Sequence, residues 1–333
     1  MLASQAPQAY DAELVLTVAR SAGPSQIGAC ITGDGTVAGY VCASLGGEGS
    51  ILIAKPYVYA SNKLHWLPLG GNRYGHVFAA NSSVIVGDVV GRGGSFPAMW
   101  SRDREQVWDQ AQLKFLSHDS AYATAISQSG TIWVQTRTME TLKGGRQVPR
   151  IGPVKRLMNG MWQTMPTNAF GLAGVDADGR LFGSQHEPHH GFGGLGRPVM
   201  IDASGRSTDL PTDGAYCSLE AVNSAGTAVG SASNRGLRAI VWESGKIGYL
   251  CDPSISRSWA KAINDKGHIV GSYVVGSEVH ACLWIGGVLY SLYRAIAGEK
   301  LSEAVAINAS GMIAAIAESD TETRLYLLTP RPR

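Results

Sequence analysis

The stretch AINDKGHIVGS at residues 262–272 decides the fold, because nearly the same phrase stands twice more in the chain. AVNSAGTAVGS occupies residues 221–231, and AINASGMIAA occupies residues 306–315. Each copy sets an asparagine three residues before a glycine and places an apolar pair beyond that glycine. A single copy would be a turn between two strands, whereas a series of copies predicts a repeat architecture.

Four weaker copies of this template lie upstream. They are CITGDGTVAG from residue 30, AANSSVIVG from 79, AISQSGTIWV from 125 and GVDADGRLFG from 174. The copies therefore begin near residues 30, 79, 125, 174, 221, 262 and 306, at a mean spacing of about 46 residues. The residues expected to have a structural role in turns are Asn223 with Gly226, Asn264 with Gly267, Asn308 with Gly311, and Asp176 with Gly179.

The chemistry of the template is that of a β-hairpin. The side-chain oxygen of the Asn, Asp, Ser or Thr can accept a backbone N–H and so open the turn. The glycine three residues later can adopt the positive φ that a type I turn with a G1 bulge requires. Apolar residues on both sides, such as Ile263 and Val270, suit strands in a half-buried sheet.

A second hairpin follows in most repeats, so each repeat encodes about four short strands. AIVWESGKIGYL (239–250) and ACLWIGGVLYSL (281–292) each consist of a strand ending in tryptophan, a glycine turn and another strand. Four-stranded units at this period are typical of propeller blades. We therefore predict an all-β fold, a seven-bladed β-propeller of four-stranded antiparallel blades, as a single domain over residues 1–333. Trp100, Trp242 and Trp284 share one repeat column and are interpreted as packing between blades.

The last copy lacks a fourth strand, because only two strand-like runs follow its turn. The N-terminal run AELVLTVA, residues 12–19, alternates apolar and polar side chains and has the length of a strand. We predict that it pairs with the last blade and closes the ring, which removes an exposed sheet edge.

Composition excludes several classes of protein. The net charge of +2 argues against a general binder of nucleic acids, which are indicated by no more than one basic loop. The five cysteines show no CxxC spacing, so buried reduced thiols are expected and a disulfide framework or structural zinc is not. No cofactor motif is found. The cysteines are Cys30, Cys42, Cys217, Cys251 and Cys282.

The N-terminus does not resemble a signal peptide. It has no basic segment, and Asp11 and Glu13 interrupt its only apolar run. No stretch approaches the roughly 20 apolar residues that a membrane-spanning helix needs. We expect synthesis in a cytoplasm without export, with incorporation into a virion as one destination.

Candidate binding residues occur in three places. KGGRQVPRIGPVKR (143–156) holds five basic residues and no acid, and it could contact phosphates or an acidic partner or form a solvated blade loop. HEPHHGF offers a weak candidate for zinc or nickel, but without the spacing that places ligands on one helix face, so no metal site is predicted. Trp259, in a segment between blades, is a candidate for an exposed contact. The basic residues are Lys143, Arg146, Arg150, Lys155 and Arg156, and the weak metal candidates are His186, His189 and His190 beside Glu187.

The stretch HACLWIGGVLYSL at 280–292 resembles the HAF repeats of bacterial proteins. His280, Ala281 and Leu283 with Trp284 stand in the characteristic columns, and the fifth and sixth copies match well. The resemblance implies a propeller and brings no catalytic motif with it. It also implies an extracellular or surface protein, although no export signal is seen here.

From these observations we expect a non-enzymatic structural or protein-docking ring. Its setting would be a larger assembly such as a bacteriophage tail, as a nozzle or tail-associated protein, with other proteins or further copies of the chain as partners. One alternative is a surface protein of HAF type that recognises a glycan or a protein. The other is a glycan-active hydrolase or lyase with acids at the mouth of the propeller.

Overall fold

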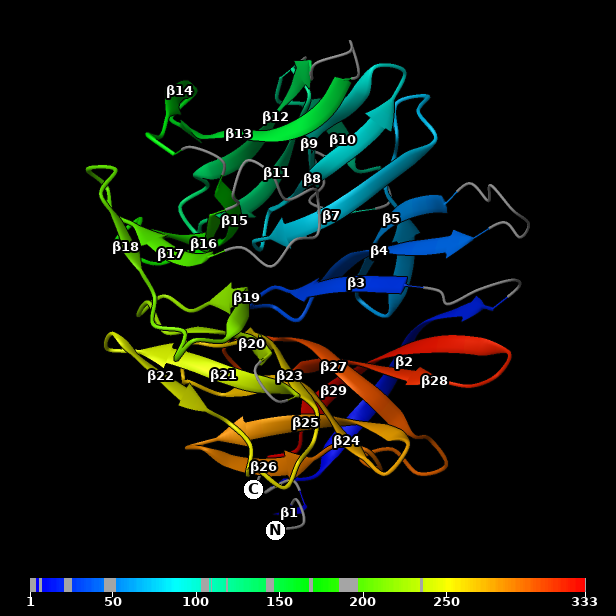
Figure 1. Cartoon of the computed structure of the whole chain (residues 1–333). Helices are drawn as coiled ribbons and strands as arrows, with labels where there is room; N and C mark the ends of the chain where they lie inside the picture. Colours follow the sequence, from blue (N-terminus) through cyan, green and yellow to red (C-terminus); the bar gives the residue numbers. More distant parts are fainter. Residues whose placement is uncertain are drawn as a thin grey trace.

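The computed structural model describes residues 4–5, 8–20, 26–44, 52–102, 108, 110–117, 119–141, 147–167, 170–185, 197–233 and 236–332. In this part of the chain, seven antiparallel four-stranded sheets are arranged as blades in a ring, and one of them carries a short fifth strand (Figure 1). The regular structure among these residues is all β, and no helix that could cross a membrane is found there. The predicted fold class, a seven-bladed β-propeller, is confirmed.

Each blade follows the chain from its first, inner strand to its fourth, outer strand. The first strands are β3 (Gln26–Ile31), β7 (Tyr74–Ala80), β11 (Ala121–Ile126), β15 (Phe170–Val175), β19 (Tyr216–Val222), β23 (Ser258–Ile263) and β27 (Leu301–Ile307). The second strands are β4 (Val37–Ser44), β8 (Val84–Gly91), β12 (Ile132–Thr141), β16 (Leu181–Gln185), β20 (Ala228–Ser233), β24 (Ile269–Val275) and β28 (Ile313–Glu318). The third strands are β5 (Leu52–Ala60), β9 (Gly94–Ser101), β13 (Gln147–Met158), β17 (Arg197–Ile201), β21 (Leu237–Glu243), β25 (Glu278–Ile285) and β29 (Glu322–Pro330). The fourth strands are β6 (Lys63–Trp66), β10 (Gln112–Phe115), β14 (Met161–Thr164), β18 (Ser207–Asp209), β22 (Lys246–Tyr249), β26 (Val288–Ser291) and, in blade seven, β2 (Tyr10–Ala19).

The two ends of the chain close the ring within blade seven. β2 pairs with β29 from Tyr10 opposite Pro330 to Ala19 opposite Glu322, and the blue strand lies beside the red ones in Figure 1. The predicted closing strand is therefore confirmed, and it begins at Tyr10. Each inner strand contacts the next around the ring, including β27 with β3. A two-residue strand, β1 (Ser4–Gln5), adds to the outer edge of blade six in parallel with β26.

Because successive strands are antiparallel, the two faces of the ring carry different connections. The face that we call the turn face carries the hairpins between first and second strands and between third and fourth strands. The opposite face, the connection face, carries the hairpins between second and third strands and the links from blade to blade. The repeated template lies on the turn face: Gly267, at φ 74°, donates its N–H to the carbonyl of Asn264 over 3.0 Å.

The buried core consists of clusters between neighbouring blades. Trp100 packs with Ala38 and Val58 of blade one, and Trp242 packs with Phe182 of blade four, so these tryptophans lie between blades as expected. The indole N–H of Trp100 donates to the carbonyl of Pro68 over 2.8 Å. This hydrogen bond holds the indole against the segment that links blade one to blade two.

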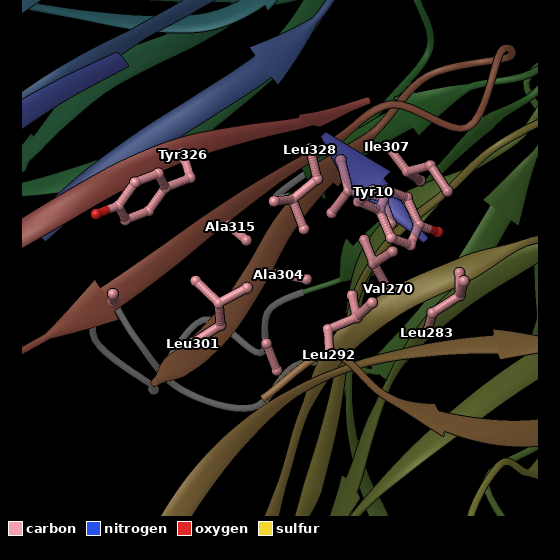
Figure 2. Packing of buried hydrophobic residues seen from close by; sticks show 13 residues of the cluster. Tyr10, Val270, Leu283, Leu292, Leu301, Ala304, Ile307, Ala315, Tyr326 and Leu328 are labelled. Carbon is pink, nitrogen blue, oxygen red and sulfur yellow. The ribbon is translucent and has the colours of Figure 1, made fainter. Parts of the chain in front are cut away.

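At the closure of the ring, Tyr10 from β2 packs among residues of blades six and seven. Val270 and Leu283 belong to blade six, and Leu301 and Leu328 to blade seven (Figure 2). The closing strand therefore contributes to the core between two blades as well as to a sheet.

Candidate functional site

The inner strands share an irregularity that exposes side chains near the axis of the ring. Six of the seven, all except β3, shift register against their second strand and so carry a β-bulge. Bulges re-aim side chains and are frequent beside active sites. In β7 the bulge falls at Phe78, whose ring is 40% exposed. In β23 it falls at Lys261, whose Nζ lies 3.4 Å from a carboxylate oxygen of Glu303 on β27.

Aromatic rings from blades one, two and three meet at this level. The His76 ring lies 4.9 Å from the Tyr40 ring, edge to face, and stacks on Phe78 at 5.9 Å. Phe78 lies 5.7 Å from Tyr122, and the guanidinium of Arg137 lies 4.7 Å above the Tyr122 ring. We call these residues, together with Asp88, the axial cluster.

The position of Tyr40 depends on the glycine opposite it. Gly28 of β3 pairs with Tyr40 of β4, and a Cβ at Gly28 would lie 2.3 Å from Cε1 of the tyrosine ring. The Tyr40 side chain therefore lies across the inner strand β3, and any residue larger than glycine at position 28 would displace it.

A histidine and a buried aspartate form the polar centre of the axial cluster. Nδ1 of His76 lies 2.7 Å from Oδ1 of Asp88, and the same oxygen accepts the backbone N–H of His76 over 3.1 Å. Asp88 is 3% exposed. An ionised carboxylate can only accept, so Nδ1 must carry a proton and the second ring nitrogen, Nε2, is the one that can accept a proton in turn.

The sheet register brings the two side chains together. His76 on β7 stands directly opposite Asp88 on β8. The preceding residue, Gly87, lets the two strands approach closely, because a Cβ there would lie 1.9 Å from the carbonyl oxygen of His76. An imidazole held by a buried carboxylate can act as a general base or acid.

The two tyrosines of the axial cluster stay protonated at neutral pH. Burial raises the pKa of Tyr40, the charge of Asp88 adds to that rise, and Lys261 opposes it. Burial likewise raises the pKa of Tyr122, and Arg137 opposes that rise. Each phenol is therefore a hydrogen-bond donor rather than an anion.

Trp259 stands in the same repeat column as His76 and Tyr122. The column is defined by pairing: His76 with Asp88, Tyr122 with Gln135 and Trp259 with Ser272. The structure thus places Trp259 on the inner strand β23, and the Arg257 guanidinium lies 5.2 Å from its ring. It contributes to the wall of the ring near the axis rather than to a segment between blades.

The basic segment 143–156 is largely strand. Lys155 and Arg156 belong to β13, where Lys155 Nζ lies 3.7 Å from a carboxylate oxygen of Asp119 and Arg156 donates to Gln163 over 2.8 Å. Arg150 lies on the same strand, whereas Lys143 and Arg146 lie outside the described residues. The described part of the segment, residues 147–156, is therefore a strand rather than a basic loop, and Lys155 in it has an acidic partner.

The described residues contain neither a metal-binding group nor a disulfide. His186, His189 and His190 lie outside the described residues. Within the described residues, no three His, Cys, Asp or Glu side chains are grouped so as to hold a metal ion. All five cysteines are described and none is in a disulfide.

His76, Asp88, Tyr40, Phe78 and Tyr122 were not singled out by the sequence analysis. A usable signal was nevertheless present at Asp88. The residue after the glycine of the second strand is Ser231 or Ser272 in the clear copies, but an aspartate in VIVGDVV. A lone acid inside a β-branched run is an outlier that calls for a partner.

No family model and no curated protein matches the chain. Among solved structures, an acylaminoacyl peptidase in complex with Z-Gly-Gly-Phe-chloromethyl ketone aligns with a TM-score of 0.59 and 9% identity, over 93% of this chain and 52% of that one. The β-propeller domain of the trilobed protease from Pyrococcus furiosus aligns with a TM-score of 0.51 and 13% identity, over 81% and 83%. That domain is described as having an open velcro topology, whereas the ring here is closed by β2. The chain spans about half the length of the acylaminoacyl peptidase.

These comparisons correct the functional expectation. At such identities they establish the shared fold, and the two structures named here are of proteases rather than of structural rings. The prediction of a non-enzymatic structural or docking protein is therefore wrong. Nothing in the comparisons points to HAF repeats or to a phage tail.

Proposed function

We propose that the protein is a hydrolase of the propeller type and that its reaction takes place at the axial cluster. The observation that carries the proposal is the contact of 2.7 Å between Nδ1 of His76 and the buried carboxylate of Asp88. A buried acid that orients an imidazole beside aromatic rings is an arrangement suited to proton transfer.

The proposed step is hydrolysis of an acyl bond by water. Nε2 of His76 takes a proton from water, and the oxygen of that water bonds to the acyl carbon. The O–H groups of Tyr40 and Tyr122 donate to the oxyanion that forms. The bond to the leaving group then breaks, and His76 returns the proton to that group.

The walls of the site indicate the class of substrate. Phe78 and Tyr122 offer faces on which a ring can stack, and the Arg137 guanidinium favours a neutral or negatively charged group. We propose an ester or amide that carries a ring, such as an acylated peptide or an aryl ester.

A second candidate function rests on the length of the chain. The chain corresponds to about half of the acylaminoacyl peptidase, so it could be the substrate-selecting propeller of a hydrolase whose catalytic residues lie elsewhere. In that case the axial cluster would bind substrate without turning it over.

Assays of the purified chain on p-nitrophenyl esters and N-acetyl-aminoacyl p-nitroanilides test the first proposal. His76→Ala should lower kcat/KM by about 100-fold or more, as expected on removing a general base. His268→Ala, on the turn face, is the matched control and should retain activity. Absence of turnover by the unaltered chain, or full activity of His76→Ala, would overturn the proposal. Substrate binding without turnover would support the second candidate.

A further inference from the structure

The hairpin between β13 and β14 exposes apolar side chains at the outer rim of blade three (Figure 1). Met158 and Met161 face each other across its turn and are 41% and 70% exposed, and Trp162, next to Met161, is 41% exposed. Asn159 and Gly160 form the turn with positive φ angles, and a Cβ placed on Gly160 would meet nothing within 4 Å beyond its chain neighbours. The tip of the hairpin therefore projects into open space.

The propeller fold does not require apolar residues at this turn. The pair that flanks the turn between the third and fourth strands is Ala60 with Lys63 in blade one and Glu243 with Lys246 in blade five. Charged residues thus occupy positions where blade three has two methionines. Exposed apolar side chains scattered singly are ordinary, but three gathered on one projecting turn indicate a contact outside the chain.

Basic side chains follow the apolar tip on both faces of the hairpin. Residues 141–175 contain five Lys or Arg and no Asp or Glu. Because side chains alternate along a strand, Arg156 lies on the same face as Met158, and Lys155 lies on the opposite face. At the rise of a strand, these two charges are roughly 7–10 Å behind Met158. Lys155 Nζ is partly offset by Asp119 at 3.7 Å, whereas Arg156 donates to a neutral side-chain amide.

We propose that this hairpin inserts into the surface of a membrane that contains anionic lipid. The methionines and the indole enter the boundary between headgroups and acyl chains, where tryptophan is favoured. The basic side chains behind them reach the level of the lipid phosphates, which attract Lys and Arg. The distance from tip to charges matches the depth of about 5–10 Å at which interfacial segments insert.

The methionines favour lipid over a nucleic acid as the partner. A nucleic acid would also meet the basic charge, but the methionine side chain offers neither a hydrogen-bond donor nor an aromatic face to a base. Acyl chains, in contrast, gain from contact with any apolar side chain. Because the hairpin belongs to the outer strands of blade three, membrane binding does not require a reaction at the axial cluster.

The test is flotation of the full chain with vesicles of phosphatidylcholine, either alone or with about 30% phosphatidylglycerol. We expect binding to the anionic vesicles and little binding to the neutral ones. The apparent Kd for the anionic vesicles should weaken several-fold between about 0.1 M and 0.5 M NaCl, because salt screens the basic side chains.

Variants of the hairpin separate the apolar contribution from the charged one. Met161→Ser should weaken the apparent Kd for anionic vesicles by about tenfold, because less apolar surface leaves water. Arg156→Gln should weaken it by about fivefold. Val288→Ser is the matched control and should bind as the unaltered chain does. Val288 is 46% exposed beside the corresponding turn of blade six, where the preceding strand β25 holds no Lys or Arg.

Brominated lipids in the same vesicles test insertion directly, since bromine quenches only a tryptophan that approaches the acyl chains. The quenching should be lost in Trp162→Phe. It should be kept in Trp66→Phe, which alters a tryptophan that is 55% exposed on β6 of blade one.

Three results would overturn the proposal. One is the absence of flotation with anionic vesicles. Another is binding without quenching of Trp162, which would show adsorption by charge alone. The third is binding of a single-stranded oligonucleotide, but not of vesicles, that is lost in Trp162→Phe, because it would assign the hairpin to nucleic acid.

Discussion

The side-chain amide of Asn308 donates to the backbone carbonyl of Thr32 over 3.0 Å, although 276 residues separate the two in sequence. The same contact recurs between other blades: Asn264 donates to the carbonyl of Asn308 over 2.9 Å, and Asn223 to that of Asn264 over 3.2 Å. Asn81 donates to Ser127 over 3.0 Å. The template asparagine thus caps its own hairpin with its oxygen and fastens the next blade with its nitrogen.

Replacing Asn308 by Asp isolates the second role. The carboxylate still accepts from the N–H of Met312, but it cannot donate to Thr32 and places a buried charge beside that carbonyl. Asp176 tolerates the same position in blade four because Arg180 pairs with it. We expect Asn308→Asp to lower the free energy of unfolding by ~2–3 kcal/mol in urea titrations. Asn159→Asp in an exposed hairpin is the control. An equal loss of stability in both variants would show that the hydrogen bond from Asn308 to the next blade does not stabilise the fold.

Deleting residues 2–20 should prevent cooperative folding of the whole ring. The deletion removes β1 and β2, and with them the buried side chains of Tyr10, Val15 and Leu16. Burial of each such side chain contributes about 1.5–3 kcal/mol, and the ladder with β29 is lost as well, which together approach the stability of a typical domain. Thermal melts followed by circular dichroism provide the measurement. A shorter deletion of residues 2–5 spares β2 and should melt nearly as the full chain does; an unchanged melting temperature in the longer deletion would contradict the prediction.

The glycine that ends the template should not tolerate alanine. A Cβ at Gly271 would lie 1.9 Å from the carbonyl oxygen of Trp259, and the contact is with backbone that cannot rotate away. We expect Gly271→Ala to cost roughly 3 kcal/mol or more, or to abolish folding. Gly33→Ala, where no atom lies within 4 Å, is the control and should change stability by less than about 1 kcal/mol. Similar unfolding midpoints for the two variants would show that the strands can separate at this point.

The repeat in the sequence was sufficient to predict the blades, their number and the closing strand, because hairpin chemistry is local. The contacts that operate between blades could not be predicted in the same way. The hydrogen bond from the Asn308 amide depends on how blade seven is placed against blade one. Within blade two, the pairing of His76 with Asp88 depends on which side chains face each other across β7 and β8, and the template does not specify the residues at these positions. Trp259 was identified as a contact residue because it was expected in a segment between blades, but its place beside the axis follows only from its position on the inner strand β23, where it pairs with Ser272.

Stability should fall as the pH rises from about 9 to 11, because of the buried thiols. Burial raises the pKa of Cys217 from 9.0 to about 11, and it raises the pKa of Cys282 well above 9.0. Between the unfolded and folded pKa values the unfolded thiol ionises and the folded one does not, so the stability present below pH 9 is lost progressively over this window. Urea midpoints at several pH values give the slope. Cys282→Ala should flatten it, whereas a slope unchanged in that variant would assign the effect to other groups.

The O–H of Tyr122 gives the sharpest test of the axial cluster as a reaction site. Burial raises the pKa of this phenol, so it is a donor over the whole neutral range. Tyr122→Phe keeps the ring that packs against Phe78, and it removes the donor to the developing oxyanion together with the hydrogen bond between the phenol and Arg137. We expect kcat to fall by about 10- to 100-fold with KM nearly unchanged, because the lost hydrogen bond is made in the transition state. Tyr216→Phe, at a tyrosine 70% exposed, is the control and should leave both constants as they were. If Tyr122→Phe raised KM and spared kcat, the phenol would bind the ground state and the oxyanion would have to be stabilised by another group.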